Sequence, residues 1–301
     1  MGSILESLPQ ASRVAVVRLR SLGDCVLTTP ALHILKRARP DLRVAVVVEE
    51  RFRGVFEGNP DLAEILPPEA GTLRRWGPRL CLNLHGGPRS AWLTAASGAG
   101  LRAGFAHFRN GFVYNVRIPR AQEILGTGRK VHTAEHLASA VFYLGAEICE
   151  IPRARLAARA AHRSSTVTAP IAVIHPFATA AGKTWAAENF VAVAEHLAAH
   201  GMEPVLIGGT GDNFAPFARF RALRGAPLDE VKTLLASAAL FVGNDSGPAH
   251  MAAAFGLPVA VIFSASDPAI WGPWRTASEV IRTPAAVGQV IEALARLQVA
   301  A

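Results

Sequence analysis

Residues 240–263 have the sequence LFVGNDSGPAHMAAAFGLPVAVIF, and this stretch decides the fold class. Apolar runs at 240–242 and 259–263 predict strands buried on both faces, and residues 247–255 between them predict a helix. A strand, a helix and a second strand in this order form a parallel βαβ unit. The stretch therefore predicts an α/β protein whose parallel sheet is covered by helices on both faces.

The same alternation extends over the rest of the second half of the chain. Further strands are predicted at 171–174 and 204–207. Further helices are predicted at 187–200, 213–223, 227–236 and 286–297. The last of these helices either completes this half or packs back on the first half.

The first half of the chain carries a second series of the same kind. Apolar runs predict strands at 13–19, 43–48 and 80–84. Helices are predicted after the loop at 85–88, to about residue 96, and over 132–144.

The segment after the first strand is ambiguous at one proline. Leu22–Asp24 predicts a turn, and a helix follows it. This helix either kinks at Pro30 or begins at Thr29 with Pro30 in its first turn, because proline lacks the N–H group that a helix interior needs.

A mixed stretch separates the two series. Residues 145–170 combine Pro, Arg, Ala, Ser and Thr without a sustained period. We therefore predict two doubly wound, Rossmann-like lobes, 1–160 and 161–301, which face each other across a cleft. Parallel sheets of this type bind ligands beyond the carboxyl ends of their strands, so a shared ligand is expected in the cleft.

Composition supports a globular, basic protein. The chain has 301 residues, of which half are hydrophobic, so it can bury a core and is not disordered. With 31 Lys and Arg against 23 Asp and Glu, its net charge is +8. Such a charge points to anionic partners, which are nucleic acid, phosphorylated metabolites or an acidic membrane surface.

Cysteine usage and hydropathy predict a cytoplasmic location. Cys25, Cys81 and Cys149 are widely spaced and form no C-x-x-C pair, which disfavours a disulfide framework and a zinc site. The first residues lack the basic and apolar regions of a secretory signal, and no apolar run reaches 18 residues. We therefore expect any membrane contact to be peripheral.

The helix at 247–255 begins with a polar cluster. Asp245, Ser246, Gly247 and His250 lie around its first turn, where the exposed N–H groups and the helix dipole attract an anion such as a phosphate. The alternative is an ordinary capped junction between strand and helix. The position at the carboxyl end of a parallel strand favours the binding site.

Two loops of the second half resemble nucleotide-binding motifs only in part. Lys183 is the middle residue of a GKT triplet at 182–184 that resembles the end of a P-loop motif, but Phe177 stands where a P-loop needs glycine. Lys183 can still contact a phosphoryl group, or it is a solvated surface lysine. The turn 208–212 fails G-x-G-x-x-G, and Asp212 there either accepts ribose hydroxyls or caps the turn.

Polar residues also follow the strands of the first half. Asp24 is either a helix cap or a base that deprotonates a hydroxyl group. Arg89 follows a glycine turn and is a surface arginine unless it binds a ligand.

Three further features have a structural interpretation beside the functional one. His132, Glu135 and His136 could suggest a metal, but a solvated helix face is favoured. His175 is interpreted as a hydrogen-bonded histidine in the core or at the rim of the sheet, and not as a catalytic residue. The basic and aromatic stretch 102–114 is a mixed edge strand and loop, a membrane-interface patch, a glycan groove or, least favoured, a nucleic-acid face.

Five segments, in this order, resemble motifs of the ADP-heptose:lipopolysaccharide heptosyltransferase family (glycosyltransferase family 9). They are RLRSLGDCVLTTPAL at 18–32, LHGGPRSA at 84–91, Lys183-x-Trp185, NDSGPAHMAAAFGLPV at 244–259 and SDPAIWGPW at 266–274. Ser264 and Ala265 depart from the Gly-Pro that usually precedes the last motif. The resemblance implies the GT-B fold, with an acceptor lobe at 1–160 and a nucleotide-sugar lobe at 161–301.

The resemblance also implies a role for each matching residue. It implies that Asp24 is the catalytic general base. It assigns the donor diphosphate to Lys183, Ser246 and Gly247, and the donor sugar or nucleotide to Asp245, Asp212, His250 and Thr179. It assigns the acceptor to Arg89 and Gly23.

The implied reaction is inverting, metal-independent transfer of a heptose or similar sugar from an ADP-sugar to a lipopolysaccharide core acceptor. No cofactor is expected besides the substrate nucleotide-sugar. The expected partners are this donor, an anionic glycolipid and the cytoplasmic face of the inner membrane, without nucleic acid, for a monomeric protein. The alternatives are another cell-surface glycan as acceptor, or a non-catalytic nucleotide-sugar-binding protein. A nicotinamide-dependent oxidoreductase is disfavoured because the glycine fingerprint is missing.

Overall fold

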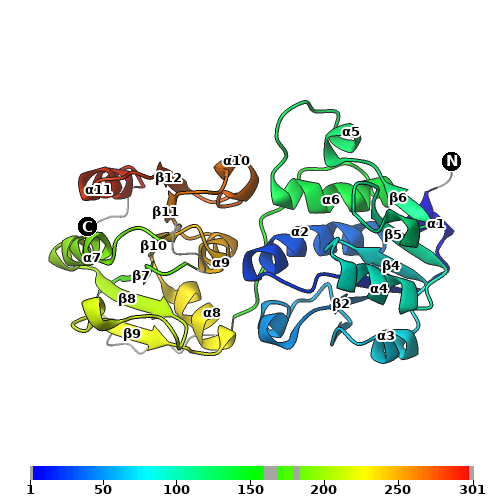
Figure 1. The fold of residues 1–301 in the computed structure, drawn as a ribbon, viewed down its shortest axis with the longest axis horizontal. Coiled ribbons are helices and arrows are strands. Elements are labelled where there is room, and N and C mark those ends of the chain that lie inside the picture. The colour runs from blue at the N-terminus through cyan, green and yellow to red at the C-terminus, as the bar shows by residue number, and fades with distance from the viewer. Residues whose placement is uncertain (1–2, 159–168, 179–183, 298–301) are drawn as a thin grey trace. The chain divides into compact units, whose positions relative to one another are not determined.

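The computed structural model describes residues 3–158, 169–178 and 184–297. The chain divides into two compact units, Met1–Arg155 (unit 1) and Leu156–Ala301 (unit 2). Each unit contains a six-stranded sheet in which every paired strand is parallel, with helices packed around it (Figure 1). The predicted α/β architecture with two parallel sheets is confirmed.

The sheet of unit 1 has the order β3-β2-β1-β4-β5-β6. The strands are β1 (Arg13–Val17), β2 (Arg43–Val47), β3 (Glu64–Leu66), β4 (Leu80–Asn83), β5 (Leu101–Phe105) and β6 (Val116–Ile118). Side chains that point to opposite faces of the central strand, such as Val16 and Val17, are both buried. Both faces of this sheet are therefore covered, as the continuous apolar runs predict.

The helices of unit 1 lie in two layers. They are α1 (Ile4–Ser7), α2 (Leu22–Ala38), α3 (Ala70–Trp76), α4 (Pro88–Ala96), α5 (Ala121–Leu125) and α6 (Thr133–Leu144), with 3-10 turns η1 (Glu50–Val55) and η2 (Gly111–Val113). The crossover through α2 leads towards β2, whereas those through α3 and α4 lead in the opposite direction along the sheet. Because such crossovers are right-handed, α2 covers one face, and α3 and α4 cover the other. Helix α6 packs beside α2 (Figure 1).

Helix α2 is one continuous helix, so the turn expected at Leu22–Asp24 is wrong, and of the two alternatives for Pro30 the helix start at Thr29 is excluded. Ser21 is its N-cap, and Pro30 lies inside it. Proline cannot donate to the carbonyl of Val26, but the hydroxyl of Thr29 donates to that oxygen over 2.9 Å. This replacement bond explains how the helix accommodates the proline.

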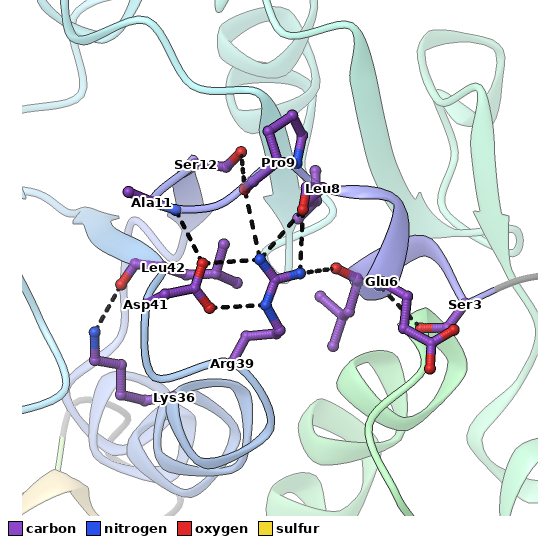
Figure 2. Close-up of polar contacts among 11 residues, drawn as sticks. Ser3, Glu6, Leu8, Pro9, Ala11, Ser12, Lys36, Arg39, Asp41 and Leu42 are labelled. Carbon is purple, nitrogen blue, oxygen red and sulfur yellow. Dashed lines mark hydrogen bonds and ion pairs between the residues drawn. The ribbon is translucent and has the colours of Figure 1, made fainter.

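Arg39, just after α2, holds the N-terminal segment in place (Figure 2). Its guanidinium donates to the carbonyl oxygens of Leu5 and Leu8 and pairs with Asp41 over 2.8 Å. Asp41 also accepts a hydrogen bond from the backbone N–H of Ala11. The hydrogen bond from Arg39 is the main reason that the pKa of Asp41 lies below its usual value.

The sheet of unit 2 has the order β12-β11-β10-β7-β8-β9. The strands are β7 (Ile171–His175), β8 (Glu203–Gly208), β9 (Arg221–Arg224), β10 (Leu240–Asn244), β11 (Val259–Phe263) and β12 (Ser278–Arg282). The helices are α7 (Ala187–Ala199), α8 (Leu228–Ser237), α9 (Gly247–Phe255), α10 (Pro268–Trp271) and α11 (Val287–Arg296), with the 3-10 turn η4 (Ala215–Phe217). Helix α11 packs against α7 and beside β12, so the last helix belongs to unit 2.

The helix expected at 213–223 is wrong. Only Ala215–Phe217 form a helical turn there, and Arg221–Arg224 form strand β9 at the edge of the sheet. The edge strands β3, β6 and β12 and the strand β5 were not predicted either. In the three edge strands, exposed positions interrupt the apolar runs by which buried strands are found, and in β5 Arg102 and Gly104 interrupt the run. Among the described residues, we find no helix whose length and hydropathy would let it span a bilayer.

Candidate functional site

In unit 1, Asp24 lies in the first turn of α2, beyond the carboxyl end of β1. Its Oδ2 accepts hydrogen bonds from the backbone N–H of Ser21 over 3.3 Å and from the Ser21 hydroxyl over 3.2 Å. Its Oδ1 lies 3.4 Å from Nη1 of Arg18. The side chain of Asp24 is 21% exposed, so the carboxylate is oriented by both neighbours and still reaches solvent.

Arg18 is a buried charged residue to which the sequence analysis gave no role. It is 5% exposed, and its Nε is buried without a hydrogen-bond partner among the described residues. Burial lowers the pKa of Arg18, and the charge of Asp24 opposes this shift. Burial also raises the pKa of Cys25, the next residue of α2, to about 12. The sequence feature that could have identified Arg18 is its position directly after an apolar strand.

The loop after β4 is organised by Asn83, the last residue of that strand. Asn83 is fully buried, and its Oδ1 accepts hydrogen bonds from the backbone N–H groups of His85 and Gly86. Its Nδ2 donates to the hydroxyls of Ser90 and Tyr114. This loop therefore has a fixed shape at the same edge of the sheet as Asp24.

The two residues predicted to bind the acceptor lie at this edge. Gly23 is buried in the first turn of α2. Arg89 is exposed in the first turn of α4, and its Nη1 lies 3.1 Å from Oε1 of Glu49. Arg89 therefore forms an ion pair at the surface, and its contact with the acceptor stays a prediction.

The solvated helix face expected for His132, Glu135 and His136 is wrong. His132 is buried and caps α6 by accepting a hydrogen bond from the N–H of Ala134. His136 stacks on Phe105 at a ring distance of 4.0 Å, and burial lowers its pKa to about 4. Among the described residues, no group of three or more His, Cys, Asp or Glu side chains could hold a metal ion.

The stretch 102–114 is a strand followed by a loop, but the strand, β5, lies between β4 and β6 and not at the edge of the sheet as expected. Phe105 and Tyr114 are buried, whereas Phe112 is 81% exposed. Arg102 donates to the carbonyl oxygens of Val113 and Ala99, so it serves the loop itself. Only part of the basic and aromatic stretch therefore faces solvent.

In unit 2, Asn244 ends β10 and is fully buried. Its Nδ2 donates to the carbonyl of Pro176 over 2.8 Å, and its Oδ1 accepts from the N–H of Trp185 over 3.0 Å. Asn244 thus ties together two segments that lie on either side of residues 177–184. The sequence analysis gave Asn244 no role of its own and missed this one.

Ser246 and His175 form a pair at the start of α9. Ser246 is the N-cap residue, and its Oγ lies 3.0 Å from Nδ1 of His175 at the end of β7. Burial lowers the pKa of His175 to about 4, against a smaller opposing effect of Asp212. The imidazole is therefore neutral at neutral pH, and its Nδ1 accepts the hydrogen bond when the ring proton is on Nε2. Gly247 follows as the first residue of α9.

The predicted acidic residues of unit 2 both have partners. Asp245 accepts a hydrogen bond from the hydroxyl of Ser266. Asp212 accepts one from the N–H of Gly209 over 2.7 Å and therefore caps the turn after β8. His250 is buried in α9. Thr179 and Lys183 lie outside the described residues, so their contacts stay predictions.

The carboxyl edge of the second sheet thus brings together most of the predicted donor residues. Asp245, Ser246 and Gly247 lie beyond β10, beside His175 at the end of β7, and Asp212 follows the neighbouring strand β8. An N-cap serine, a helix N-terminus and a nearby carboxylate can bind a phosphate and a hydroxyl-bearing group. This is the edge at which parallel α/β sheets bind ligands.

Comparisons with known proteins agree with this geometry. Residues 72–292 match the model of glycosyltransferase family 9 (heptosyltransferase). The chain is 26% identical over 288 residues to lipopolysaccharide heptosyltransferase 3 of Escherichia coli, covering 85% of the chain and 83% of that protein. It is 25% identical over 297 residues to lipopolysaccharide heptosyltransferase 1 of Pseudomonas aeruginosa, covering 87% of the chain and 81% of that protein.

Solved structures share the fold. A family 9 glycosyltransferase from Veillonella parvula is 20% identical with a TM-score of 0.83, over 96% of this chain and 97% of that one. Escherichia coli ADP-heptose heptosyltransferase II is 20% identical with a TM-score of 0.81, over 95% of this chain and 98% of that one. These similarities confirm the predicted two-lobe GT-B fold class. The family model covers most of the chain, and we conclude that the chain is a glycosyltransferase that belongs to glycosyltransferase family 9, the heptosyltransferase family.

Proposed function

We propose that this enzyme transfers a heptose from ADP-heptose to a lipopolysaccharide core acceptor, with inversion at the anomeric carbon. The relatives named lipopolysaccharide heptosyltransferase support the acceptor class. The structure titled ADP-heptose lps heptosyltransferase II supports the donor. Unit 1 binds the acceptor in this proposal, and unit 2 binds the donor.

The position of Asp24 carries the proposal. Inversion in a single displacement requires a base that takes the proton from the acceptor hydroxyl as its oxygen bonds to the anomeric carbon. Asp24 is a partly exposed carboxylate that Ser21 and Arg18 hold in one orientation. The bond from the sugar to the diphosphate breaks in the same step, and the proton goes to Asp24.

The negative charge of the departing ADP needs stabilisation on unit 2. The N-terminus of α9, which begins at Ser246 and Gly247, offers a helix dipole and backbone N–H donors for this charge. Lys183 adds a positive charge in our proposal. We further propose that these groups replace a divalent metal ion.

The remaining predicted residues bind the substrates in this proposal. Asp245, Asp212, His250 and Thr179 contact the sugar or the nucleotide, whereas Arg89 and Gly23 face the acceptor. We propose that the enzyme acts in the cytoplasm, at the inner surface of the membrane that holds the glycolipid.

A panel of nucleotide-sugars tests the donor and the stereochemistry. The chain is incubated with ADP-, UDP- and GDP-linked sugars and with a core acceptor that lacks heptose, and the anomeric configuration of the product is determined by NMR. We expect transfer from ADP-heptose alone and a product of opposite configuration to the donor. A preference for UDP-sugars would overturn the donor assignment, and retention of configuration would overturn the role of Asp24.

A further inference from the structure

The positive charge of this chain is concentrated in one stretch. Residues 70–122 contain eight arginines and no Asp, Glu or Lys. The rest of the chain has 23 basic and 23 acidic residues, so this stretch accounts for the whole net charge of +8. A segment of this length without a carboxylate creates a positive field over the surface that it forms.

This stretch forms one side of unit 1. It contains α3, α4 and η2, with α3 and α4 on the sheet face opposite α2. Two large apolar side chains face solvent there, Trp92 on α4 at 60% exposure and Phe112 on η2 at 81%. Helix α4 packs against η2, so the two aromatic residues belong to neighbouring elements of the same layer.

Hydrogen bonds and packing hold the two residues that follow Phe112 against the sheet. Arg102 donates to the carbonyl of Val113, and the buried hydroxyl of Tyr114 accepts a hydrogen bond from Asn83. The ring of Tyr114 also lies against Gly104, where a Cβ atom would come within 2.7 Å of it. Phe112 is therefore exposed on a turn whose next two residues are fixed to the sheet.

Arginines surround these aromatic residues. Arg109 is exposed just before η2, and Arg74 packs beside Gly98 at the end of α4. Arg117 pairs with Gly104 in the ladder of β5 and β6, so its side chain leaves the sheet on the face where Tyr114 lies. Within the described ranges, none of these three arginines has a carboxylate partner.

We propose that this α4–η2 face, with Trp92, Phe112, Arg74, Arg109 and Arg117, binds the surface of an anionic lipid bilayer. Tryptophan and phenylalanine enter the interface between lipid headgroups and acyl chains, and arginines attract acidic headgroups. The face adjoins the sheet edge that carries Asp24, because α4 begins at the carboxyl end of β4. The proposal deepens the proposed function, since it rests on an acceptor that is anchored in a membrane.

Vesicle sedimentation of the full chain tests the proposal. The probes are vesicles of phosphatidylcholine alone and of phosphatidylcholine with phosphatidylglycerol. We expect binding only to the anionic vesicles and release by high salt. The variant Arg109→Gln/Arg117→Gln should bind these vesicles about 25-fold more weakly, at about fivefold for each arginine near an anionic surface. The variant Trp92→Ser/Phe112→Ser should also lose binding.

Matched controls lie on the other helix layer of unit 1. Tyr143 on α6 is an exposed aromatic residue, and Arg37 on α2 is an exposed arginine. Tyr143→Ser and Arg37→Gln should sediment with anionic vesicles like the wild type. Thermal unfolding verifies that each variant is folded, which is expected because the substituted side chains are exposed.

The outcomes separate this proposal from the proposed function. Equal binding of the wild type and both double variants, or an equal loss in the controls, overturns the docking face. Binding to a core glycolipid but not to phosphatidylglycerol vesicles also overturns it, because the ligand is then the acceptor and not the bilayer. A chain that binds vesicles through this face but transfers no heptose to a detergent-dispersed acceptor refutes the proposed function and leaves the docking face intact.

Discussion

Replacing Asn244 with alanine tests how unit 2 shapes its donor site. Asn244 is fully buried and makes one hydrogen bond to Pro176 and one to Trp185. The alanine variant loses both bonds and leaves the Trp185 N–H and the Pro176 carbonyl without this partner. The segments on either side of residues 177–184 are then no longer connected through this side chain.

The expected loss of stability follows from the two bonds. At about 1–2 kcal/mol for each buried hydrogen bond whose partner is left unsatisfied, the free energy of unfolding falls by about 2–4 kcal/mol. For a unit of this size, such a change lowers the melting temperature by on the order of 10 °C. We also expect ADP to bind roughly tenfold more weakly, as when a charge-assisted hydrogen bond is lost, because Asn244 holds Trp185, which follows Lys183 by two positions in the sequence.

Calorimetry and titration with ADP measure both effects. Asn83→Ala is the matched control, because Asn83 is also a fully buried asparagine at the end of a strand and also bonds to loop backbone. It should destabilise unit 1 and leave the affinity for ADP unchanged. Wild-type stability for Asn244→Ala, or an equal loss of ADP affinity in both variants, would refute the role that we infer for Asn244.

Three further predictions follow from the same structure. Burial lowers the pKa of His175 in the folded chain to about 4. The unfolded chain therefore binds a proton at this histidine near pH 6.5, whereas the folded chain does not. The free energy of unfolding should consequently fall as the pH decreases from about 6.5 to about 4. His175→Asn should flatten this part of a plot of melting temperature against pH, and an unchanged slope would contradict the shift. Gly243→Ala should destabilise unit 2 by about 1–3 kcal/mol, since the new Cβ would lie 2.8 Å from the carbonyl oxygen of His175. Gly288→Ala in α11, where the Cβ meets nothing within 4 Å, should instead stabilise it by about 0.5–1 kcal/mol in urea unfolding. Finally, the transfer rate should be unaffected by EDTA, and a loss that Mg²⁺ restores would refute metal independence.

The buried strands and long helices could be predicted because their signals are local. Apolar runs place β1, β2, β10 and β11, and a cap followed by apolar periodicity places α9. Strand β9 could not be found in this way. The sequence RALR at 221–224 forms a strand because it pairs with β8, and this pairing depends on the order of the sheet.

The candidate site also combines features that local sequence signals predict with features that depend on the folded chain. Ser21 and Asp24 have the spacing of a capping box, so the local role of Asp24 at a helix start could be predicted from the sequence. The pairing of Arg18 with Asp24 and the two bonds of Asn244 could not. The partners of Asn244 come from segments that meet only at the carboxyl edge of a folded sheet, and a pattern along the chain does not contain that proximity. Arg18 is close to Asp24 in the sequence, but the burial of its side chain beside the carboxylate follows from the folded unit.

The rate of transfer by Asp24→Asn tests the central claim most directly. Asparagine keeps an oxygen that can accept the hydrogen bonds from Ser21, but it cannot take up a proton from the acceptor hydroxyl. Because the buried Arg18 loses its charge partner, thermal unfolding and ADP titration must first show that the variant is folded and binds nucleotide. With saturating ADP-heptose, we predict a transfer rate about 10²–10⁴-fold below that of the wild type. A folded variant that binds ADP and transfers heptose at the wild-type rate would contradict the assignment of Asp24 as the base.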